Sequence, residues 1–353
     1  MTTQPTVAPH SKTILGQFGR FVTQADFDLG SEPFSLGKAS LIAQLGLSEN
    51  ASMLVNQPSI NMVRHALIDT IGNTLIGSKL PIAVKTQTAT SGWGTGASAV
   101  LGTDLLLPAP WAALANCTAG NLLQVNDWEA QGHNPTSTII FSALLATAAE
   151  NEGAVIGGRA IFDAFLAGFE VVARIGKAVH ANTHQNGQHS TAPIETLGAV
   201  GAAAAVSRLN RLTAEQATHA MSIAINQAVS STDQGDTNNK ALQAGLAAKT
   251  GVVAATLAAN GLTGQPNILE ANNRFTQLLG IRQVDQHSPV LAKLGSSLAI
   301  NDASRDIMTL TQVLARFTNN TGLAADSRQV LALQQWIEAA DIVEVINQFT
   351  YQS

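Results

Sequence analysis

The sequence predicts a mainly all-α protein with a large buried core. Apolar residues recur at helical spacing along most of the chain, and the alternation typical of strands is scarce. Of the 353 residues, 45% are hydrophobic and only 12% are charged, a composition that argues against disorder. Two alanine- and glycine-rich stretches, 197–206 and 245–261, are apolar on nearly every side, which is typical of helices packed within a core.

Composition also limits the classes of function. The formal net charge is -5 and no basic patch stands out, which argues against a nucleic-acid-binding protein. The single cysteine, Cys117, excludes a disulfide framework and favours a reducing compartment. Residues 1–11 lack an apolar signal core, and the most apolar window, 197–206, is about half as long as a bilayer span. We therefore expect a soluble cytoplasmic protein that binds no membrane.

Four helices are expected in the first half of the chain, each with apolar residues three or four positions apart. Their expected ranges are 60–75, 108–123, 137–150 and 158–179. The second begins with Pro108 and Pro110, because proline is tolerated in a first helical turn. The fourth carries Arg174, which we expect on its polar side.

Five more helices are expected in the second half, at 192–209, 213–228, 239–260, 302–317 and 326–349. Thr213 and Gln216 form a capping-box pattern, and Gly261 is a typical C-terminal stop. Strand signals are confined to a weak alternation over 81–88 and a short segment, 97–101, after a glycine-rich stretch. We expect a small hairpin there.

His189 lies in the stretch GQHST, directly before the predicted helix 192–209. Ser190 and Thr191 are typical N-cap residues, so His189 precedes a helix N-terminus. The partial positive charge there disfavours an imidazolium and leaves a neutral ring that can accept a proton. The pattern predicts a proton-transfer group beside a bound anion. The alternative is a solvated histidine in a polar loop.

His180 and His184 invite a metal-binding interpretation, because residues four apart share one face of a helix. No acidic residue lies between them, and Asn182 indicates that the helix has already ended. We therefore expect no metal site.

Two further features attract attention. Lys240 begins an apolar helix, where a lysine is unfavourable with the helix dipole unless an anionic ligand is near. The alternative is a solvated lysine on the first turn.

The loop 126–133 contains Asn126, Asp127, Glu129 and His133, polar groups between two helices. By itself an ordinary solvated loop is the more common explanation.

These features belong to one longer pattern. The motifs HNPTS at 133–137, GQHSTAP at 187–193 and NNKALQAGL at 238–246 follow in order. With the intervening segments, residues 59–275 resemble the MmgE/PrpD family, which includes 2-methylcitrate dehydratase, cis-aconitate decarboxylase and iminodisuccinate epimerase. The resemblance implies a large helical domain and a smaller α+β lid, usually in a dimer. It also implies action on di- and tricarboxylates without a metal or organic cofactor.

The resemblance implies roles for individual residues. The histidine of the family motif GxHxT matches His189, and the histidine of its HP motif matches His133, although Asn134 is inserted here. The lysine that opens a family helix matches Lys240. We expect His189 to move a proton with His133 as its partner, Lys240 to hold a substrate carboxylate, and Thr191 to contact the substrate.

The chain departs from the family pattern at several positions. A motif aspartate is replaced by Gln124, two further aspartate positions are Asn126 and Asp127, and the histidine of the lysine helix is Gln243. Glutamine cannot serve as a general base, so we expect Gln124 and Gln243 to bind substrate only. Asp127, or Glu129, is then expected to act as an auxiliary acid or base.

The segment that builds the lid is not recognisable after residue 275, so the lid is expected to be absent or vestigial. The expected organisation is a disordered tail, a helical domain, a shortened connection replacing the lid, and a C-terminal helix that packs back on the helical domain. These parts are 1–11, 12–280, 281–325 and 326–350.

Three hypotheses of function follow. The first is a lyase, either a dehydratase or a decarboxylase, that acts on a small carboxylate. The second is an epimerase or isomerase on the same scaffold, which needs proton removal and return but no leaving group. The third is a non-catalytic protein that completes a related chain. The expected assembly is a homodimer or a heteromer with a relative.

Overall fold

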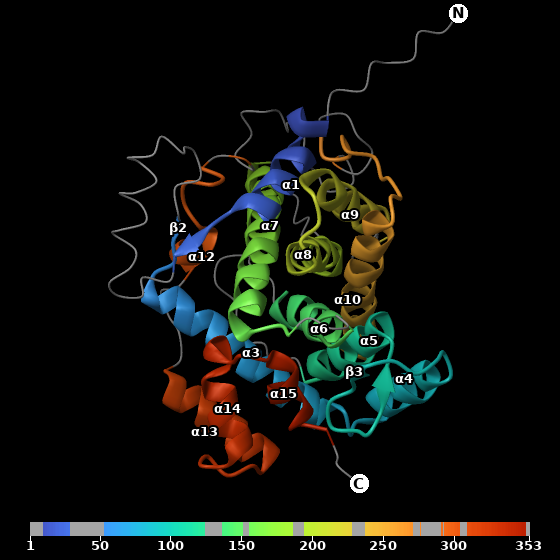
Figure 1. The fold of residues 1–353 in the computed structure, drawn as a ribbon, viewed down its shortest axis with the longest axis vertical. Coiled ribbons are helices and arrows are strands. Elements are labelled where there is room, and N and C mark those ends of the chain that lie inside the picture. The colour runs from blue at the N-terminus through green and yellow to red at the C-terminus, as the bar shows by residue number, and fades with distance from the viewer. Residues whose placement is uncertain are drawn as a thin grey trace, which may run out of the picture.

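Helices make up nearly all the regular structure in the described part of the chain (Figure 1). The computed structural model describes residues 10–28, 53–123, 136–150, 155–185, 194–227, 237–270, 276, 291, 293–303 and 309–350. The first helices are α1 (Ile14–Gln24), α3 (Gln57–Gly77), α4 (Pro81–Ser91), α5 (Ala109–Asn121), α6 (Ser137–Ala149) and α7 (Gly158–Gln185). They are followed by α8 (Ile194–Leu209), α9 (Ala214–Gln227), α10 (Thr237–Ala259), α12 (Ala299–Ala303), α13 (Leu310–Thr321), α14 (Arg328–Gln334) and α15 (Ile342–Asn347).

The strands of the described residues form two minimal ribbons. β1 (Phe27–Asp28) pairs in parallel with β2 (Met53–Leu54), with Phe27 opposite Met53. β3 (Ser98–Ala99) pairs antiparallel with β4 (Leu106–Leu107), with Ser98 opposite Leu107. The all-α prediction is therefore confirmed. Of the two strand signals, only 97–101 contributes to a hairpin, and its partner strand at 106–107 was not predicted.

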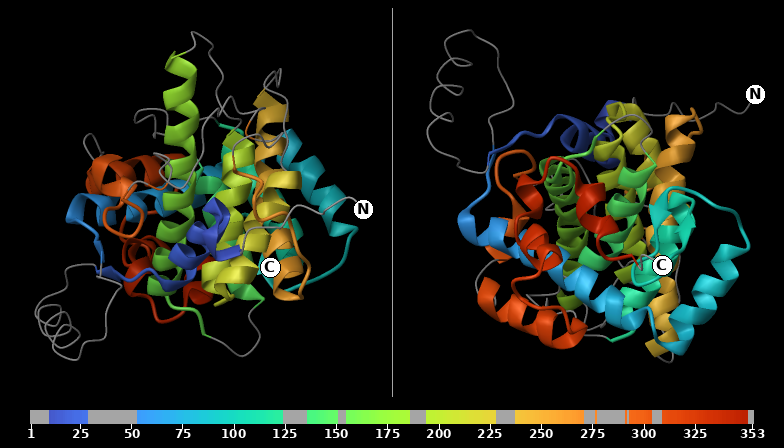
Figure 2. Two further views of the ribbon diagram at one scale, coloured as in Figure 1. Left: turned by 90° about the horizontal axis from the view of Figure 1, so that it is seen from above. Right: turned by 60° about the horizontal axis from the view of Figure 1, so that its bottom comes forward.

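The alanine-rich helix α8 lies at the centre of the fold, between α7 on one side and α10 on the other (Figure 1). Small side chains let the backbones approach closely, as predicted for helices buried on all sides. A β-carbon at Gly168 of α7 would lie 2.4 Å from the carbonyl oxygen of Gly201, and one at Gly251 of α10 would lie 2.3 Å from Cβ of Ala202. Figure 2 shows α7, α8 and α10 running side by side, with α7 extending beyond its neighbours.

The C-terminal elements pack against α3, α6 and α7. Trp336, in the 3-10 turn η2 (Trp336–Glu338), is fully buried beside Phe141 and Phe162. Arg316 of α13 pairs with Asp69 of α3 at 2.5 Å. Burial raises the pKa of Asp69 above its ordinary value, and Arg316 opposes that rise.

Several element boundaries differ from the predictions. Residues 81–88, read as weakly alternating, lie in α4 because Pro81 opens a helix whose buried residues Ala83, Gln87 and Thr90 follow the helical period. The predicted helix 326–349 is broken into α14, η2 and α15, because Ala339 is extended and Asp341 caps a new helix.

Two further expectations were wrong. α7 continues to Gln185, six residues beyond the predicted end, so Asn182 does not stop it. Arg174 is not on a solvated side of this helix, since its side chain is only 7% exposed. The turn η1 (His10–Lys12) also shows that regular structure begins before residue 12, inside the expected disordered tail. Residues 1–9 lie outside the described part.

One described helix, α10, passes a membrane-span test by length and composition, with a mean hydropathy of 1.3 over an 18-residue window within Asn238–Ala259. Most of its apolar window is nevertheless buried against other helices, chiefly α5, α8 and α9. A core helix passes the same test, so this is weak evidence for a membrane span.

The capping box at the start of α9 provides a first stability prediction. Gln216 N donates to Thr213 Oγ1 at 3.2 Å, and Thr213 N donates to Gln216 Oε1 at 2.9 Å. Replacing Thr213 with alanine is expected to lower the free energy of unfolding by about 1 kcal/mol, measured by urea denaturation. The control is Thr88→Ala in the middle of α4, where a surface change of less than about 0.5 kcal/mol is expected. Equal losses would contradict the capping role.

Candidate functional site

Five helix termini meet at one end of the helical core. At Gly120, near the end of α5, a β-carbon would lie 2.8 Å from Cγ2 of Thr138, near the start of α6. At Gly198, near the start of α8, it would lie 2.5 Å from Cδ1 of Ile139. The C-terminal part of α7 joins them, because Gly176 faces Leu197 of α8.

The start of α10 belongs to the same group. Ala241 is in one buried cluster with Ala119 and Leu122, which are at the end of α5. The other end of α10 lies beside the start of α9, since Gln216 Nε2 donates to the carbonyl oxygen of Ala259 at 3.2 Å. We call the end formed by the last turns of α5 and α7 and the first turns of α6, α8 and α10 the converging end.

The converging end is where the chain enters or leaves three segments outside the described residues. These segments, 124–135, 186–193 and 228–236, connect α5 to α6, α7 to α8, and α9 to α10. Five of the predicted site residues fall in the first two segments, and their positions lie outside the described part of the chain. They are Gln124, Asp127, His133, His189 and Thr191.

Lys240 and Gln243 are described, and both lie at the start of α10. Lys240 is in the first turn and is exposed, whereas Gln243, three residues later on the same side, is half-buried. Ala241 lies between them and anchors this turn against α5. The structure thus brings these two predicted residues together and leaves the lysine open to solvent.

Two buried threonines near the converging end were not predicted as site residues. Thr136 precedes α6 but makes no side-chain cap bond, and its hydroxyl has no hydrogen-bond partner although the residue is 1% exposed. Thr118 of α5 is also fully buried with an unpaired hydroxyl, beside Gly245 of α10. In the sequence Thr136 looks like an ordinary cap residue, so no local signal distinguishes it.

The electrostatics of the converging end combine opposite helix ends. The N-termini of α6, α8 and α10 carry partial positive charge at this end, while the C-terminal parts of α5 and α7 bring the opposite partial charge. An anion is favoured only directly in front of the three N-termini. Among the described residues, Thr136 and Lys240 lie at such helix starts, before α6 and in the first turn of α10.

The carboxyl groups with perturbed pKa values are not among the predicted site residues. Burial raises the pKa of Asp163 and of Glu170, both on α7, while Arg159 and Arg174 oppose these rises. Burial also raises the pKa of Glu270, whose Oε1 accepts from the backbone of Ile14 at 2.8 Å. Each of these groups has a hydrogen-bond partner in the described part of the fold.

No group of three histidine, cysteine, aspartate or glutamate side chains suited to a metal ion is found among the described residues. His180 and His184 do lie within α7, contrary to the predicted helix end, but their side chains lie outside what is described. The expectation of no metal site therefore stays a prediction.

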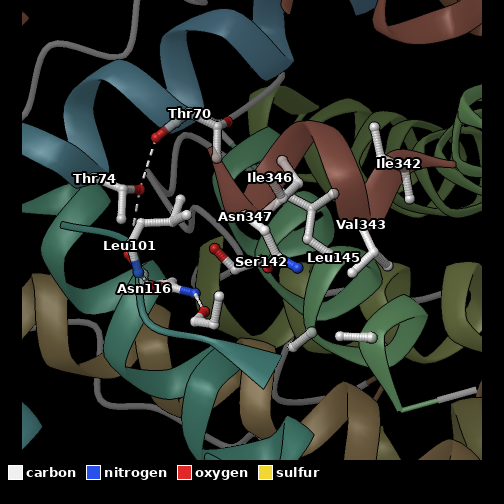
Figure 3. Close-up of a pocket in the computed structure, with 13 residues that line it drawn as sticks. Thr70, Thr74, Leu101, Asn116, Ser142, Leu145, Ile342, Val343, Ile346 and Asn347 are labelled. Carbon is white, nitrogen blue, oxygen red and sulfur yellow. Dashed lines mark hydrogen bonds between the residues drawn. The ribbon is translucent and has the colours of Figure 1, made fainter. Parts of the chain in front are cut away.

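A small pocket lies between α3, α5, α6 and α15, and neither Lys240 nor Gln243 lines it (Figure 3). Its cavity of about 10 Å³ has room for one water molecule. Ser142 contributes a buried hydroxyl without a partner, and Asn116 uses its side chain to hold the hairpin backbone at Ala99 and Leu101. The pocket contains none of the predicted site residues and is too small for a carboxylic acid.

Comparisons with known proteins agree with this arrangement. Residues 51–286 match the model of the MmgE/PrpD N-terminal domain. Cis-aconitate decarboxylase of Aspergillus terreus is 27% identical over 248 residues, which is 67% of this chain and 50% of that protein. Human cis-aconitate decarboxylase is 28% identical over 220 residues, covering 61% of this chain and 45% of that protein. A cis-aconitate decarboxylase-like protein of Aspergillus oryzae is 27% identical over 65% of this chain and 49% of that protein.

The chain spans about half the length of the curated relatives it matches. The matched region contains every predicted site residue, from Gln124 to Gln243, and all the helices of the converging end. By sequence and by helical architecture, the chain belongs to the MmgE/PrpD family.

Proposed function

We propose that this protein is a cofactor-independent lyase that acts on a small di- or tricarboxylate at the converging end. Three curated relatives are named for the decarboxylation of cis-aconitate or for likeness to such an enzyme, which supports a dehydratase or decarboxylase type of chemistry. The observation that carries the proposal is the meeting of the α6, α8 and α10 N-termini, because Lys240 and Gln243 lie in the first turns of α10, and His133, His189 and Thr191 come shortly before α6 and α8 in the sequence.

The proposed chemistry is proton transfer beside a carboxylate. His189 precedes Ile194, the first residue of α8, by five positions in the sequence. In the proposal the helix N-terminus keeps its ring neutral, and the ring accepts the proton from the carbon next to the carboxylate, or returns one to it. His133 is its partner, and Asp127 is an auxiliary acid or base. In dehydration the C–H electron pair forms the new double bond and the protonated hydroxyl leaves as water. In decarboxylation the electron pair of the broken C–C bond stays on carbon and takes up the proton.

Lys240 is proposed to hold a substrate carboxylate, with Gln124, Gln243 and Thr191 as neutral hydrogen-bonding groups. An ammonium on the first turn of α10 is close to the helix N-terminus, whose partial positive charge attracts the same anion. The glutamines can hydrogen-bond to a carboxylate but cannot accept its proton, which restricts acid–base work to the histidines and Asp127.

Replacing Lys240 with alanine is expected to raise the KM for the carboxylate substrate by about 10- to 100-fold, because a charge-assisted hydrogen bond is lost. The measurement is steady-state kinetics with the acid that responds in the screen described next. Lys249→Ala is the matched control on the same helix, since Lys249 lies over the ring of Trp111 instead. An unchanged KM in the Lys240 variant would remove this residue from the proposed site.

The function itself is tested by proton NMR of the purified protein in heavy water with small carboxylic acids, beginning with cis-aconitate and citrate. Loss of water or CO2 from one of them supports the lyase. Deuterium in recovered substrate without net elimination supports the epimerase alternative. No change in any acid, with or without a relative, contradicts both catalytic hypotheses.

A non-catalytic role is the second candidate, and a specific observation favours it. Gln243 stands at the position where the resemblance places a histidine of the family. Such a chain would complete a longer relative in a heteromer, whereas the lyase is proposed to be a homodimer. Sedimentation of the purified chain, alone and mixed with a full-length relative, distinguishes the two assemblies.

A further inference from the structure

A buried ion pair on α7 is not part of the proposed site and binds a different segment of the chain. Arg174 Nε donates to Glu170 Oε1 at 2.6 Å, and the side chains are only 7% and 1% exposed. Two charges so deeply buried are costly unless their remaining hydrogen-bonding groups are also satisfied. The hydrogen-bond partners of these two side chains therefore show which segment of the chain the ion pair holds in place.

Those groups belong to a segment more than a hundred residues later in the chain. The second carboxylate oxygen of Glu170 accepts from the backbone N–H of Ala299 at 2.7 Å. Arg174 Nη2 donates to the carbonyl oxygens of Lys293 and Ser297 at 3.1 and 2.8 Å. The ion pair thus binds the backbone of residues 293–301, which we call the strap.

The strap is fixed at its far end as well. The side chain of Asn301 accepts from the N–H of Asn56 at 3.3 Å and from the hydroxyl of Ser59 at 2.9 Å, and it donates to the carbonyl oxygen of Leu54 at 2.9 Å. Leu298 and Ile300 are buried between these polar contacts. The strap therefore joins α7 to β2 and to the start of α3.

The strap contains a strained residue at the end that Arg174 binds. Lys293 has φ of 63°, a left-handed conformation that costs a residue other than glycine free energy. Its carbonyl oxygen also accepts from the backbone of Ser296 and Ser297. A short segment in such a conformation needs an external partner to hold it, and the guanidinium of Arg174 is that partner.

We propose that Glu170 and Arg174 form a latch that fixes the strap on α7, and that breaking this latch releases the strap while α8 and α10 stay folded. This inference does not depend on the proposed reaction.

The test is hydrogen exchange of the full chain, followed by mass spectrometry, in the wild type and in Glu170→Gln. A glutamine amide places a donor against Arg174 Nε and removes the charge, so amides 294–301 are expected to exchange at least about tenfold faster. Amides of α8 and α10 are expected to be unchanged. The matched control is Asp163→Asn, which breaks another i,i+4 pair on α7, with Arg159, without touching the strap.

Unchanged exchange of the strap in Glu170→Gln, or an equal increase throughout the chain, overturns the proposal. A second measurement on the wild type covers the case in which the variant does not fold. In low, rising denaturant the strap amides are expected to open at a lower concentration than those of α8. Exchange of both only by global unfolding also overturns the proposal.

Discussion

Replacing His189 with alanine is expected to lower turnover of the responsive carboxylate by at least about 100-fold, because general acid–base catalysis contributes that much or more. The free energy of unfolding is expected to stay within about 0.5 kcal/mol of the wild type, which shows that the loss of turnover is not a loss of the fold. The measurements are single-turnover rates and urea denaturation on the same samples.

His184→Ala is the control for this experiment, because His184 lies on α7 and has no role in the proposed chemistry. Its turnover is expected to equal that of the wild type. Loss of activity in both variants would favour the metal-binding interpretation of His180, His184 and His189. An unaltered rate in His189→Ala would remove the central residue of the mechanism.

Replacing Trp336 with alanine is expected to have the largest effect on stability, about 3–5 kcal/mol in the free energy of unfolding. Its ring is fully buried, 5.9 Å from that of Phe141 in an edge-to-face arrangement and 6.3 Å from that of Phe162. The loss leaves a cavity between α6, α7 and the C-terminal elements. Urea denaturation monitored by circular dichroism measures it.

Trp93→Ala is the matched control, because the ring of Trp93 is 55% exposed and contacts only Trp111 among the described aromatic rings. An aromatic pair of this kind contributes about 0.5–1.5 kcal/mol. Similar losses in the two variants would contradict the view that the C-terminal elements are part of the helical core.

The sequence predicted most helices because their signals are local. Prolines mark the start of α5, the capping box marks the start of α9, and Gly261 follows α10 in a left-handed conformation. The buried faces of α8 and α10 follow from alanine and glycine content alone. Local patterns of this kind need no knowledge of distant contacts.

The errors arose where distant contacts decide the structure. The break after α14 contains no proline or glycine, and it is held by bonds to residues far away in the chain. Gly158 N donates to the carbonyl oxygen of Ala339, and Ile342 N donates to that of Ile156, both at 2.8 Å. Arg174 was expected in solvent because the strap that covers it comes more than a hundred residues later.

In the candidate site, too, local sequence patterns predicted some features, whereas others depend on distant contacts. The motifs containing His133, His189 and Lys240 could be found one by one, since each directly precedes or begins a helix. The sequence could not show that α6, α8 and α10 begin at the same end of the core, because this depends on how the helices pack. The unpaired hydroxyl of Thr136 also becomes visible only when its buried surroundings are known.

The central claim is that an uncharged imidazole and an ammonium face the same substrate acid at the converging end. A crystal structure of the protein soaked with cis-aconitate tests it most directly. We predict one cavity in which a carboxylate of the ligand contacts both Lys240 Nζ and the ring of His189. Side chains of His189 and Lys240 in separate places, with no shared cavity between them, would contradict the account.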